Sequence, residues 1–382
     1  MKFSSVRSLE ELVERGIVHL GRGKVISKRD IATCPGPYPI YSSAKDNDGK
    51  FGEYGQYLYD EELITWSVDG GGRLFHRPKH KFSVTNVGGV LRIQDKSVLE
   101  YRYLYYALTL RHSETIFDWV KKAHPSVIKK LYQEIPIPTL DEQKRISGKL
   151  DEAFAGLAKA KENAEKNLQN ARALFESHLE SVFTQRGPGW ADKKVSELAK
   201  HSLGKMLDKA KNKGDLQPYL RNINVRWFTF DLSDLLEMPF LPNEADKYTA
   251  VKGDVLICEG GYPGRAAIWN EDYPIYFQKA LHRVRFHQTE LNKWFVYYLS
   301  LQDSNGCLKK YFSGTGIQHF TGEALARFLI PVPPSPELMQ AITRFDALMQ
   351  ETQRLARIYQ QKLEAFESFK KSILHEAFSG NL

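Results

Sequence analysis

Six segments of this chain combine hydrogen-bond donors with glycine and aromatic residues, a combination that suits contact with nucleic acid. In the first half they are YSSAKDNDGK at 41–50, GGGRLFHR at 70–77 and KKAHPSVIKK at 121–130. In the second half they are YLRNINVRW at 219–227, GGYPGR at 260–265 and GTGIQHF at 314–320. Arginine, lysine, asparagine and glutamine side chains pair with base edges or phosphates, and glycine-rich loops let the backbone approach closely. The alternative interpretation is that these segments are solvated turns.

The side chains with this chemistry form a candidate set for DNA contact. In the first half they are Ser43, Lys45, Asn47, Arg73, Lys121, Lys122 and His124. In the second half they are Arg221, Asn222, Asn224, Arg226, Tyr262, Arg265, Gln278, Gln318 and His319. Arg73 and Arg265 occupy the same place in two glycine-rich loops. His124 and His319 lie in basic loops, where contact with a phosphate or base is favoured over catalysis.

Sequence motifs of catalysis are not found. The Gly-Lys pair at 23–24 is followed by Val25, where a phosphate-binding loop has serine or threonine. GGGR at 70–73 lacks the G-x-G-x-x-G spacing of a dinucleotide site. The chain has neither the N-P-P-F type of loop found in amino-methyltransferases nor an H-x-x-x-H zinc helix. Asp254 and Glu259 could form a metal pair, but GDVLICEGG carries no lysine at the spacing typical of nucleases.

Composition describes an ordinary folded chain with excess positive charge. The 382 residues are 42% hydrophobic, and the formal net charge of +8 is a mild argument for a polyanionic partner. Cys34, Cys258 and Cys307 are isolated, which argues against a disulfide framework or a zinc ribbon. No run of about 18 apolar residues occurs, and the N-terminus lacks the apolar core of a signal peptide. We therefore expect a soluble, cytoplasmic protein.

An internal repeat organises the chain. The segment that begins IPIPTLDEQKRISGKLDEAF at Ile135 returns from Ile330 onward without a gap. Matching residues include Pro136 and Pro331, Pro138 and Pro333, Glu142 and Glu337, Asp151 and Asp346, Leu168 and Leu363, and Phe183 and Phe378. A period near half the chain length indicates two copies of one unit.

Each copy continues into a helix with a nearly heptad apolar seam. The first seam is Leu150, Phe154, Leu157, Lys161, Ala164, Leu168, Ala171, Phe175, His178 and Val182. The second is Leu338, Ile342, Phe345, Met349, Thr352, Ala356, Tyr359, Leu363, Phe366, Lys370, Ile373 and Ala377. A helix of roughly 44 residues spans about 65 Å, longer than a small domain. Two such rods most simply pack on each other, although a long amphipathic helix on a globular core is the alternative.

The helix starts carry capping signals. In the first copy, Thr139 and Glu142 have the spacing of a capping box. In the second copy, Ser335 is expected to cap the helix, with Pro336 at its first position.

Two β-rich heads precede the two helical segments. Short aromatic and β-branched runs separated by glycine and asparagine indicate strands and turns, and YRYLYYALTL indicates a helix inside the first head. The heads echo each other weakly: Glu62-Leu63-Ile64 parallels Val255-Leu256-Ile257, and Leu104-Tyr105-Tyr106 parallels Val296-Tyr297-Tyr298. We expect heads at 1–134 and 187–329 and helical segments at 135–186 and 330–382.

The duplicated I-P-[IV]-P segment before a long helix, with a basic β-rich head before each copy, resembles the specificity subunit of type I restriction-modification enzymes. IPIPTLDEQKRISGKLDEAF is the most specific part, and YPIYSS, KGDVLI and LHEAFSGNL are also similar to that family. The second copy departs from the pattern, because ELMQAITR replaces the E-Q-K-R run.

The resemblance implies an α+β fold in which two target-recognition domains are separated by an antiparallel coiled coil with pseudo-twofold symmetry. It implies no catalysis by this chain. Two modification subunits would methylate adenine with S-adenosylmethionine, and restriction subunits using ATP and magnesium would join them on double-stranded DNA with a bipartite target. Glu142, Gln143, Lys149 and Glu337 are the candidate contacts for the modification subunits.

Two other classes stay open. One is a DNA enzyme with an unrecognised active site in one head. The other is a coiled-coil adaptor whose heads bind proteins, and it requires no salt-sensitive affinity for DNA.

Overall fold

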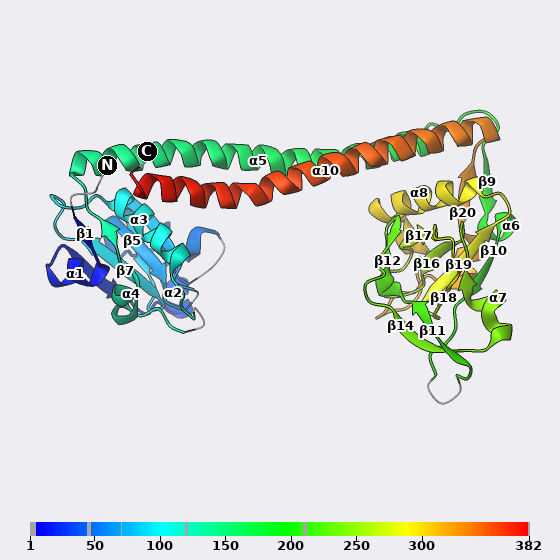
Figure 1. The fold of residues 1–382 in the computed structure, drawn as a ribbon, viewed down its shortest axis with the longest axis horizontal. Coiled ribbons are helices and arrows are strands. Elements are labelled where there is room, and N and C mark those ends of the chain that lie inside the picture. Colours follow the sequence, from blue (N-terminus) through cyan, green and yellow to red (C-terminus); the bar gives the residue numbers. More distant parts are fainter. Residues whose placement is uncertain (1–4, 44–46, 70, 119–120, 209–211, 381–382) are drawn as a thin grey trace. The chain divides into compact units, whose positions relative to one another are not determined.

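The computed structural model describes residues 5–43, 47–69, 71–118, 121–208 and 212–380, which fall into two compact units. Unit 1 comprises Met1–Glu165 and Gln360–Leu382, and unit 2 comprises Lys166–Tyr359. Each unit holds one globular head and part of the two long helices, α5 (Leu140–Thr184) and α10 (Ser335–Phe378) (Figure 1). We call the part before α5 head 1 and the part between α5 and α10 head 2. Among the described residues, no helix has both the length and the apolar character that crossing a membrane requires.

Head 1 is built on a six-stranded sheet with the order β2-β7-β5-β6-β3-β4. Helix α3 lies between this sheet and the long helices (Figure 1). The elements of head 1 are β1 (Val6–Arg7), α1 (Leu9–Glu14), β2 (Val18–Arg22), α2 (Lys28–Thr33), β3 (Tyr38–Tyr41), η1 (Asn47–Gly49), β4 (Lys50–Tyr54), β5 (Tyr59–Ser67), β6 (Leu74–Val84), β7 (Gly88–Ile93), α3 (Tyr101–Glu114), α4 (Pro125–Leu131) and β8 (Ile135–Pro136). The predicted helix within YRYLYYALTL is confirmed as α3.

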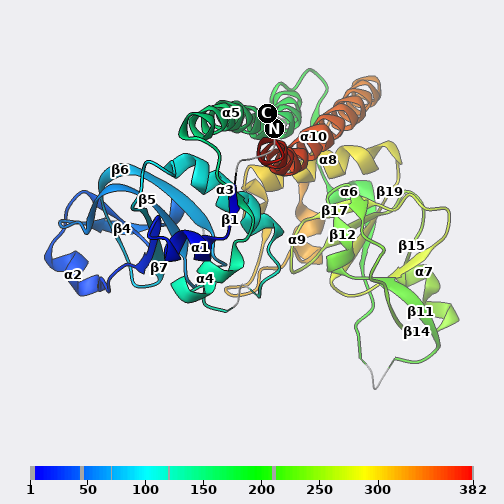
Figure 2. The same ribbon diagram turned by 60° about the vertical axis from the view of Figure 1, so that its left-hand side comes forward.

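Head 2 contains two four-stranded sheets, β10-β19-β16-β17 and β14-β11-β18-β15. The β11-β14 ribbon lies at the end of the head remote from α8 (Figure 2). The elements of head 2 are β9 (Ala191–Lys194), α6 (Val195–Leu198), β10 (Ala199–Leu203), β11 (Asp215–Leu220), η2 (Asn222–Asn224), β12 (Val225–Arg226), β13 (Thr229–Phe230), β14 (Leu236–Phe240), η3 (Pro242–Glu244), α7 (Ala245–Tyr248), β15 (Thr249–Ala250), β16 (Val255–Cys258), β17 (Ala266–Ile268), β18 (Ile275–Phe277), β19 (Leu281–Phe286), α8 (Glu290–Ser304), η4 (Cys307–Tyr311), α9 (Gly322–Arg327) and β20 (Leu329–Val332).

The two heads share one strand plan. Strands β2, β7 and β5 of head 1 pair as β10, β19 and β16 pair in head 2. The end of β6 runs parallel to β3, as β18 runs parallel to β11. The long strand β6 therefore corresponds to two short strands, β17 and β18, because the turn-forming segment 270–274 (NEDYP) interrupts the second copy. This break divides the single sheet of head 1 into the two sheets of head 2.

The apolar seams predicted for α5 and α10 are confirmed by burial. Every predicted seam position of α5 is buried or half-buried, including Lys161 and His178, whereas most positions between them are exposed. Along α10 the same holds except at Lys370, which is exposed. The helices run antiparallel within each unit. In unit 1, Lys370 lies over the ring of Phe154 and Lys161 forms an ion pair with Glu367, so the partner number falls as the α5 number rises.

The same polar joint fastens each head to a long helix. In unit 1, Tyr106 of α3 donates a hydrogen bond from its hydroxyl to Asp151 of α5 at 2.5 Å, and Arg102 pairs with the same carboxylate. In unit 2 the corresponding contacts to Asp346 of α10 come from Tyr297 at 2.5 Å and Lys293 at 2.6 Å. Burial, together with the hydrogen bond to the carboxylate, raises the pKa of both tyrosines, so the hydroxyls remain donors at neutral pH.

A second contact repeats beside this joint. The hydroxyl of Tyr103 donates to the carbonyl of Pro136 at 2.9 Å, and the Trp294 indole donates to the carbonyl of Pro331 at 2.7 Å. Pro136 lies in the extended I-P-x-P segment that pairs with β1, and Pro331 lies in the copy that pairs with β9. The predicted extended segments before both helices are therefore confirmed.

The repeat equivalences predicted within the heads are wrong in register. The joints align Tyr106 with Tyr297, so the second helical match is displaced by one residue. Strand pairing aligns Ile64-Thr65-Trp66, not Glu62-Leu63-Ile64, with Val255-Leu256-Ile257, which is a displacement of two residues. Short apolar runs resemble one another at several registers, and only tertiary partners distinguish these registers.

The caps also differ in part from expectation. Thr139 caps α5, because its hydroxyl accepts from the N–H of Glu142 at 3.4 Å. The Glu142 carboxylate instead binds Arg145, so the reciprocal half of the capping box is not formed. In the second copy, the N–H of Leu338 donates to the carbonyl of Pro334, so Pro334 is the cap and Ser335 is the first helical residue.

We predict that Tyr106→Phe and Tyr297→Phe each lower the free energy of unfolding of their unit by about 1–2 kcal/mol, because each removes a hydrogen bond to a carboxylate. Urea titration of the full chain measures this effect. Tyr273→Phe is a suitable control, because Tyr273 is 50% exposed. Equal stabilities for all three variants would contradict the role assigned to the joint.

Candidate nucleic-acid interface

Three loops meet at one end of head 1: the loop after β3, the turn between β5 and β6, and the segment before α4. The Ser43 hydroxyl donates to the carbonyl of Val87 at 2.5 Å and accepts from the N–H of Asp69 at 3.3 Å. The Lys122 ammonium lies 3.5 Å from the Asp69 carboxylate. Arg73 closes the turn between β5 and β6. Candidate residues that are distant in sequence are thus held in one place, which we call the three-loop junction.

Head 2 has the corresponding junction. The Asn222 side chain donates to the carbonyl of Gly260 at 3.0 Å, and the Arg265 guanidinium donates to the carbonyl of Asn222 at 3.0 Å. His319 pairs with Gly260 in an isolated β-bridge, and its imidazole lies 3.3 Å from the Glu259 carboxylate. The predicted residues Asn222, Arg265 and His319 therefore come together.

Backbone hydrogen bonds show that the two junctions are the same structure. Three backbone bonds of the head 1 junction have counterparts in head 2. The matched pairs of donor and acceptor are Ser67→Arg73 with Cys258→Arg265, Ala123→Val68 with Phe320→Glu259, and Val68→Val87 with Glu259→Ala280. The predicted equivalence of Arg73 and Arg265 is confirmed in position. Lys122 corresponds to His319, and Ser43 corresponds to Asn222.

A glycine precedes the arginine in both turns because the backbone is left-handed there. Gly72 has φ 69° and Gly264 has φ 89°. A Cβ at Gly264 would also lie 2.3 Å from a methyl carbon of Leu308. A larger residue at Gly264 would strain the backbone at this φ and would require the Leu308 side chain to move. The turn therefore fixes where the following arginine begins.

The two junction arginines lie against aromatic rings. The guanidinium of Arg265 is 3.9 Å from the ring centre of Tyr262, which is 58% exposed. The guanidinium of Arg73 is 5.1 Å from that of Phe75. Beneath the second turn, burial raises the pKa of the Cys258 thiol to about 11, although Arg265 opposes the shift. This thiol is therefore neutral at physiological pH, and the positive charge of Arg265 is not offset by a thiolate.

Other candidates lie on exposed positions. These are Asn47, Lys121, Arg226 and Gln318. His124 is half-buried at the N-terminus of α4 and forms no side-chain cap. Gln278, which follows β18, is half-buried, and its backbone N–H donates to the carbonyl of Leu220 at the end of β11. Lys45 lies outside the described residues.

Two candidates are misassigned, because the structure gives them internal roles. Asn224 is 1% exposed, and its side chain accepts from the N–H of Arg221 and donates to the carbonyls of Asp231 and Asp234. Gln143 is 0% exposed, accepts from the N–H of Glu100, and donates to two carbonyls. Neither amide can reach DNA or another chain. For Gln143, two of the three partners, Val98 and Glu100, are distant in sequence, and only the fold brings them together.

Arg221 is also largely committed to its own head. Its guanidinium donates to the carboxylate and the carbonyl of Asp234 at 2.7 and 2.8 Å.

The remaining candidates for contact with the modification subunits lie on the long helices. Lys149 is exposed, Glu142 pairs with Arg145, and Glu337 accepts from the Trp190 indole.

Sequence inspection did not single out Arg77, which shapes the loop after β3. It is 1% exposed and lies 3.6 Å from the ring centre of Tyr41. Its guanidinium donates to the side chain and the carbonyl of Asp48, both at 2.7 Å. Burial lowers the pKa of Arg77, while Asp48 opposes the shift. It is the last residue of the donor-rich segment GGGRLFHR, but nothing local distinguishes it from the other basic residues of β6.

A Gly-Lys pair at the same place in both heads was also missed. Gly23 and Gly204 each approach the strand beside them so closely that a Cβ would meet a backbone carbonyl oxygen at 2.0 and 2.3 Å. Lys24 is exposed, whereas the Lys205 ammonium is buried and bonded to Glu244 at 2.6 Å. Comparison of the two heads could have found the pair, whereas the search for a phosphate-binding loop rejected it.

The structure also tests the carboxylates considered as a metal pair. Asp254 is 2% exposed and accepts two hydrogen bonds from Arg285, both at 2.7 Å. Glu259 follows the opposite end of β16 and lies beside His319. The structure therefore separates these two carboxylates.

Comparison with known proteins identifies the family. Residues 5–167 and 188–365 match the family described as type I restriction modification DNA specificity domain. The specificity subunit of the type I restriction enzyme MjaVIII of Methanocaldococcus jannaschii is 22% identical over 377 residues, covering 91% of this chain and 86% of that protein. The specificity subunit of the type I restriction enzyme MpnII of Mycoplasma pneumoniae is 30% identical over 136 residues, covering 35% and 40%.

A solved structure supports the fold. A chain from a study of complex assembly and conformational transition of the type I R-M system has a TM-score of 0.72 at 17% identity, covering 96% of this chain and 98% of that chain. This chain spans about half the length of the first curated relatives it matches. Because the family match extends over most of the sequence, the chain belongs to the type I restriction-modification DNA specificity family.

We predict that Arg73→Ala and Arg265→Ala each weaken specific DNA binding by about 1–3 kcal/mol if the arginine pairs with a base. Competition between matched and altered duplexes at fixed salt measures this effect. Arg265→Lys is the matched variant, because it keeps the charge and loses the bidentate geometry. An equal loss on every duplex would instead assign the arginine to phosphate contact. Asn224→Ala should destabilise head 2 without changing base preference.

Proposed function

We propose that this chain is the DNA sequence-specificity subunit of a type I restriction-modification complex, with each head reading one half of a bipartite target. The observation that carries this proposal is the three-loop junction, which recurs in both heads with matching backbone bonds, one shared arginine and two differing side chains. Head 1 presents Ser43, Arg73 and Lys122 where head 2 presents Asn222, Arg265 and His319. A constant scaffold with divergent donors is suited to reading two different base sequences.

The chemistry would belong to partner subunits. Modification subunits would supply S-adenosylmethionine and adenine methylation, and restriction subunits would supply ATP, magnesium and cleavage, in the cytoplasm. The support in this chain is that buried charged side chains form ion pairs within the fold: Asp254 pairs with Arg285, and Lys205 pairs with Glu244. The proposed role of the chain is therefore to bind and to position, not to turn over a substrate.

The long helices would dock two modification subunits and set the distance between half-sites. Lys149 is exposed on α5, and Glu142 and Glu337 occupy the same repeat position near the starts of the two helices. Equivalent positions on two copies of one helix suit two copies of one partner. Gln143 is excluded from this surface by its burial.

The proposal predicts independent half-sites. Exchanging residues 187–329 for the equivalent head of a relative should change one half of the methylated sequence and leave the other half unchanged. Methylation mapping in cells that also express the modification subunits measures this result, and the purified chain alone should transfer no methyl group. Binding of the chain to its target should fall with log salt by about 0.9 per neutralised phosphate. A protein-binding adaptor would show no such dependence, and altered bases in both halves would refute independent reading.

The helices should act as a ruler. Inserting one heptad in each helix, near Asn163 and Ile358, preserves the apolar seam and adds about 10 Å, or roughly three base pairs of DNA rise. The second half-site also rotates by about 100° around the duplex, which bending or twisting of the DNA must absorb. We expect a longer unspecified spacer between two unchanged half-sites. Genome-wide methylation mapping decides the point, because an unchanged spacer with retained activity would show that the helices do not measure the target.

A further inference from the structure

The hairpin that carries Arg226 in head 2 ends in an unusual turn. Strands β12 and β13 pair Arg226 with Thr229, which leaves Trp227 and Phe228 as the turn residues. Phe228 has φ 67°, a left-handed conformation that glycine or asparagine normally supplies in such turns. A bulky aromatic residue adopts it at a conformational cost, and it persists only where surrounding contacts compensate.

The compensating contacts come from α8 of head 2 and from the long helix α5. The Phe228 ring lies 5.6 Å from that of Tyr297 on α8 and 6.3 Å from that of Phe175 on α5, measured between ring centres. Its N–H donates to the carbonyl of Ala266 at 3.1 Å, next to Arg265. One residue therefore connects the hairpin, the junction turn and two helices.

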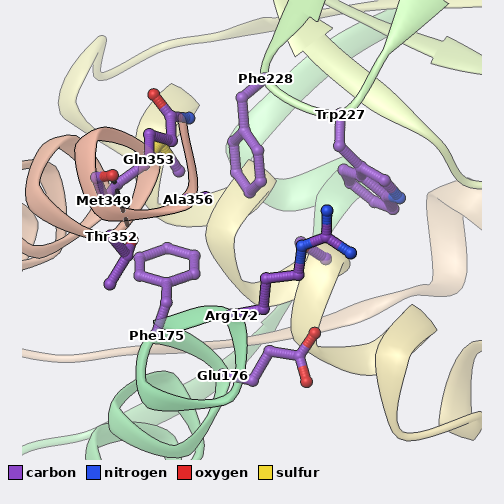
Figure 3. Close-up of a pocket in the computed structure, with 10 residues that line it drawn as sticks. Arg172, Phe175, Glu176, Trp227, Phe228, Met349, Thr352, Gln353 and Ala356 are labelled. Atoms are coloured by element: carbon purple, nitrogen blue, oxygen red, sulfur yellow. Dashed lines mark hydrogen bonds between the residues drawn. The ribbon is translucent and has the colours of Figure 1, made fainter. Parts of the chain in front are cut away.

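The groove around this ring is apolar on most sides. Figure 3 shows Phe228 pointing toward Phe175, with Met349 of α10 to one side and Trp227 to the other. The cavity has a volume of about 340 Å³. On the other side of the turn, Trp227 and Asp303 of α8 line one pocket, and burial raises the pKa of the Asp303 carboxyl. Both turn residues therefore lie against elements outside the hairpin.

Unit 1 holds its loop after β3 in a different way. There Arg77, within the sheet, binds Asp48 of the loop. The α10 residue at the repeat position of Phe175 is Lys370, which lies over Phe154 of α5. The aromatic anchor on the long helix is therefore specific to head 2, and it is not a requirement of the shared fold.

We propose that Phe228 is a positioning residue for the second half-site, which ties the segment from Asn222 to Arg226 to α5 so that its donors face the DNA in one arrangement. The inference rests on the proposed function, because it names what holds one of the two reading surfaces in place. Phe228 itself contacts no base. It acts by keeping the hairpin conformationally ordered.

The test compares two variants that break the anchor from opposite sides. Phe228→Gly removes the ring and also relieves the left-handed strain, whereas Phe175→Ala leaves the hairpin sequence intact. Each full-length variant, assembled with its modification subunits, is titrated with duplexes carrying the mapped target, a scrambled first half or a scrambled second half. We expect discrimination at the second half to fall about tenfold, comparable to loss of one base contact, with the first half unchanged. Amide hydrogen exchange at 223–230 should become faster in the free chain.

Two controls separate positioning from damage. Leu174→Ala changes an exposed residue adjacent to Phe175 and should match the wild type. Phe228→Tyr keeps the ring and should restore discrimination. Unchanged second-half discrimination in both anchor variants would overturn the inference, as would an equal loss at both halves. A wild-type complex that distinguishes neither half would defeat the proposed function, whereas hydrogen exchange still reports whether the anchor orders the hairpin.

Discussion

Each head completes its core only with a phenylalanine from the end of a long helix. Tyr103 of head 1 packs on Phe378, the last residue of α10, with ring centres 5.3 Å apart. Trp294 of head 2 packs on Phe183 near the end of α5 at 4.4 Å. These two phenylalanines match in the internal repeat, so each copy of the repeat supplies the closing residue of the other copy's head. Burying them fixes one helix end to each head, and the polar joints at Asp151 and Asp346 attach the other long helix to the same head.

The shared scaffold tolerates exchanges that keep a buried bond while changing the residues that make it. In head 1, the Trp66 indole donates to the carbonyl of Ala123, and Gly89 opposite leaves room for the ring. In head 2, Ile257 takes the tryptophan position, and His282 takes the glycine position. The His282 imidazole bonds the carbonyl of Phe320, which corresponds to that of Ala123. Burial lowers the pKa of His282, so the neutral ring is the form that fits, and the carbonyl is satisfied from the opposite strand.

Features set by local periodicity could be predicted from the sequence, and features set by distant partners could not. The seams of α5 and α10 and the Thr139 cap depend on residues within a few turns of each other, and these predictions are correct. Asn224 and Gln143 have polar side chains that sequence alone leaves available for binding, and the fold shows that backbone groups occupy them. Arg77 was overlooked for the opposite reason, since its burial arises from strands and a loop that its neighbours do not reveal. The structure thus brings several of the predicted residues together at the three-loop junctions, and it also shows which side chains are committed to internal hydrogen bonds.

If each head reads one half-site, as proposed, two reading surfaces on one chain would require more rigidity than either surface alone. Once one head is bound, the second would meet its half-site at an effective concentration set by the connection between them, and a flexible connection would lower that concentration. Within each head, the groups proposed to contact DNA would need a fixed arrangement. In head 1, Arg77 of the sheet binds Asp48 of the loop after β3, whereas in head 2 the Phe228 ring packs against Phe175 of α5. In head 2, α5, which would set the distance between half-sites, therefore contacts the β12-β13 hairpin, which would contact DNA. A substitution at Phe175 would then also change the packing of that hairpin.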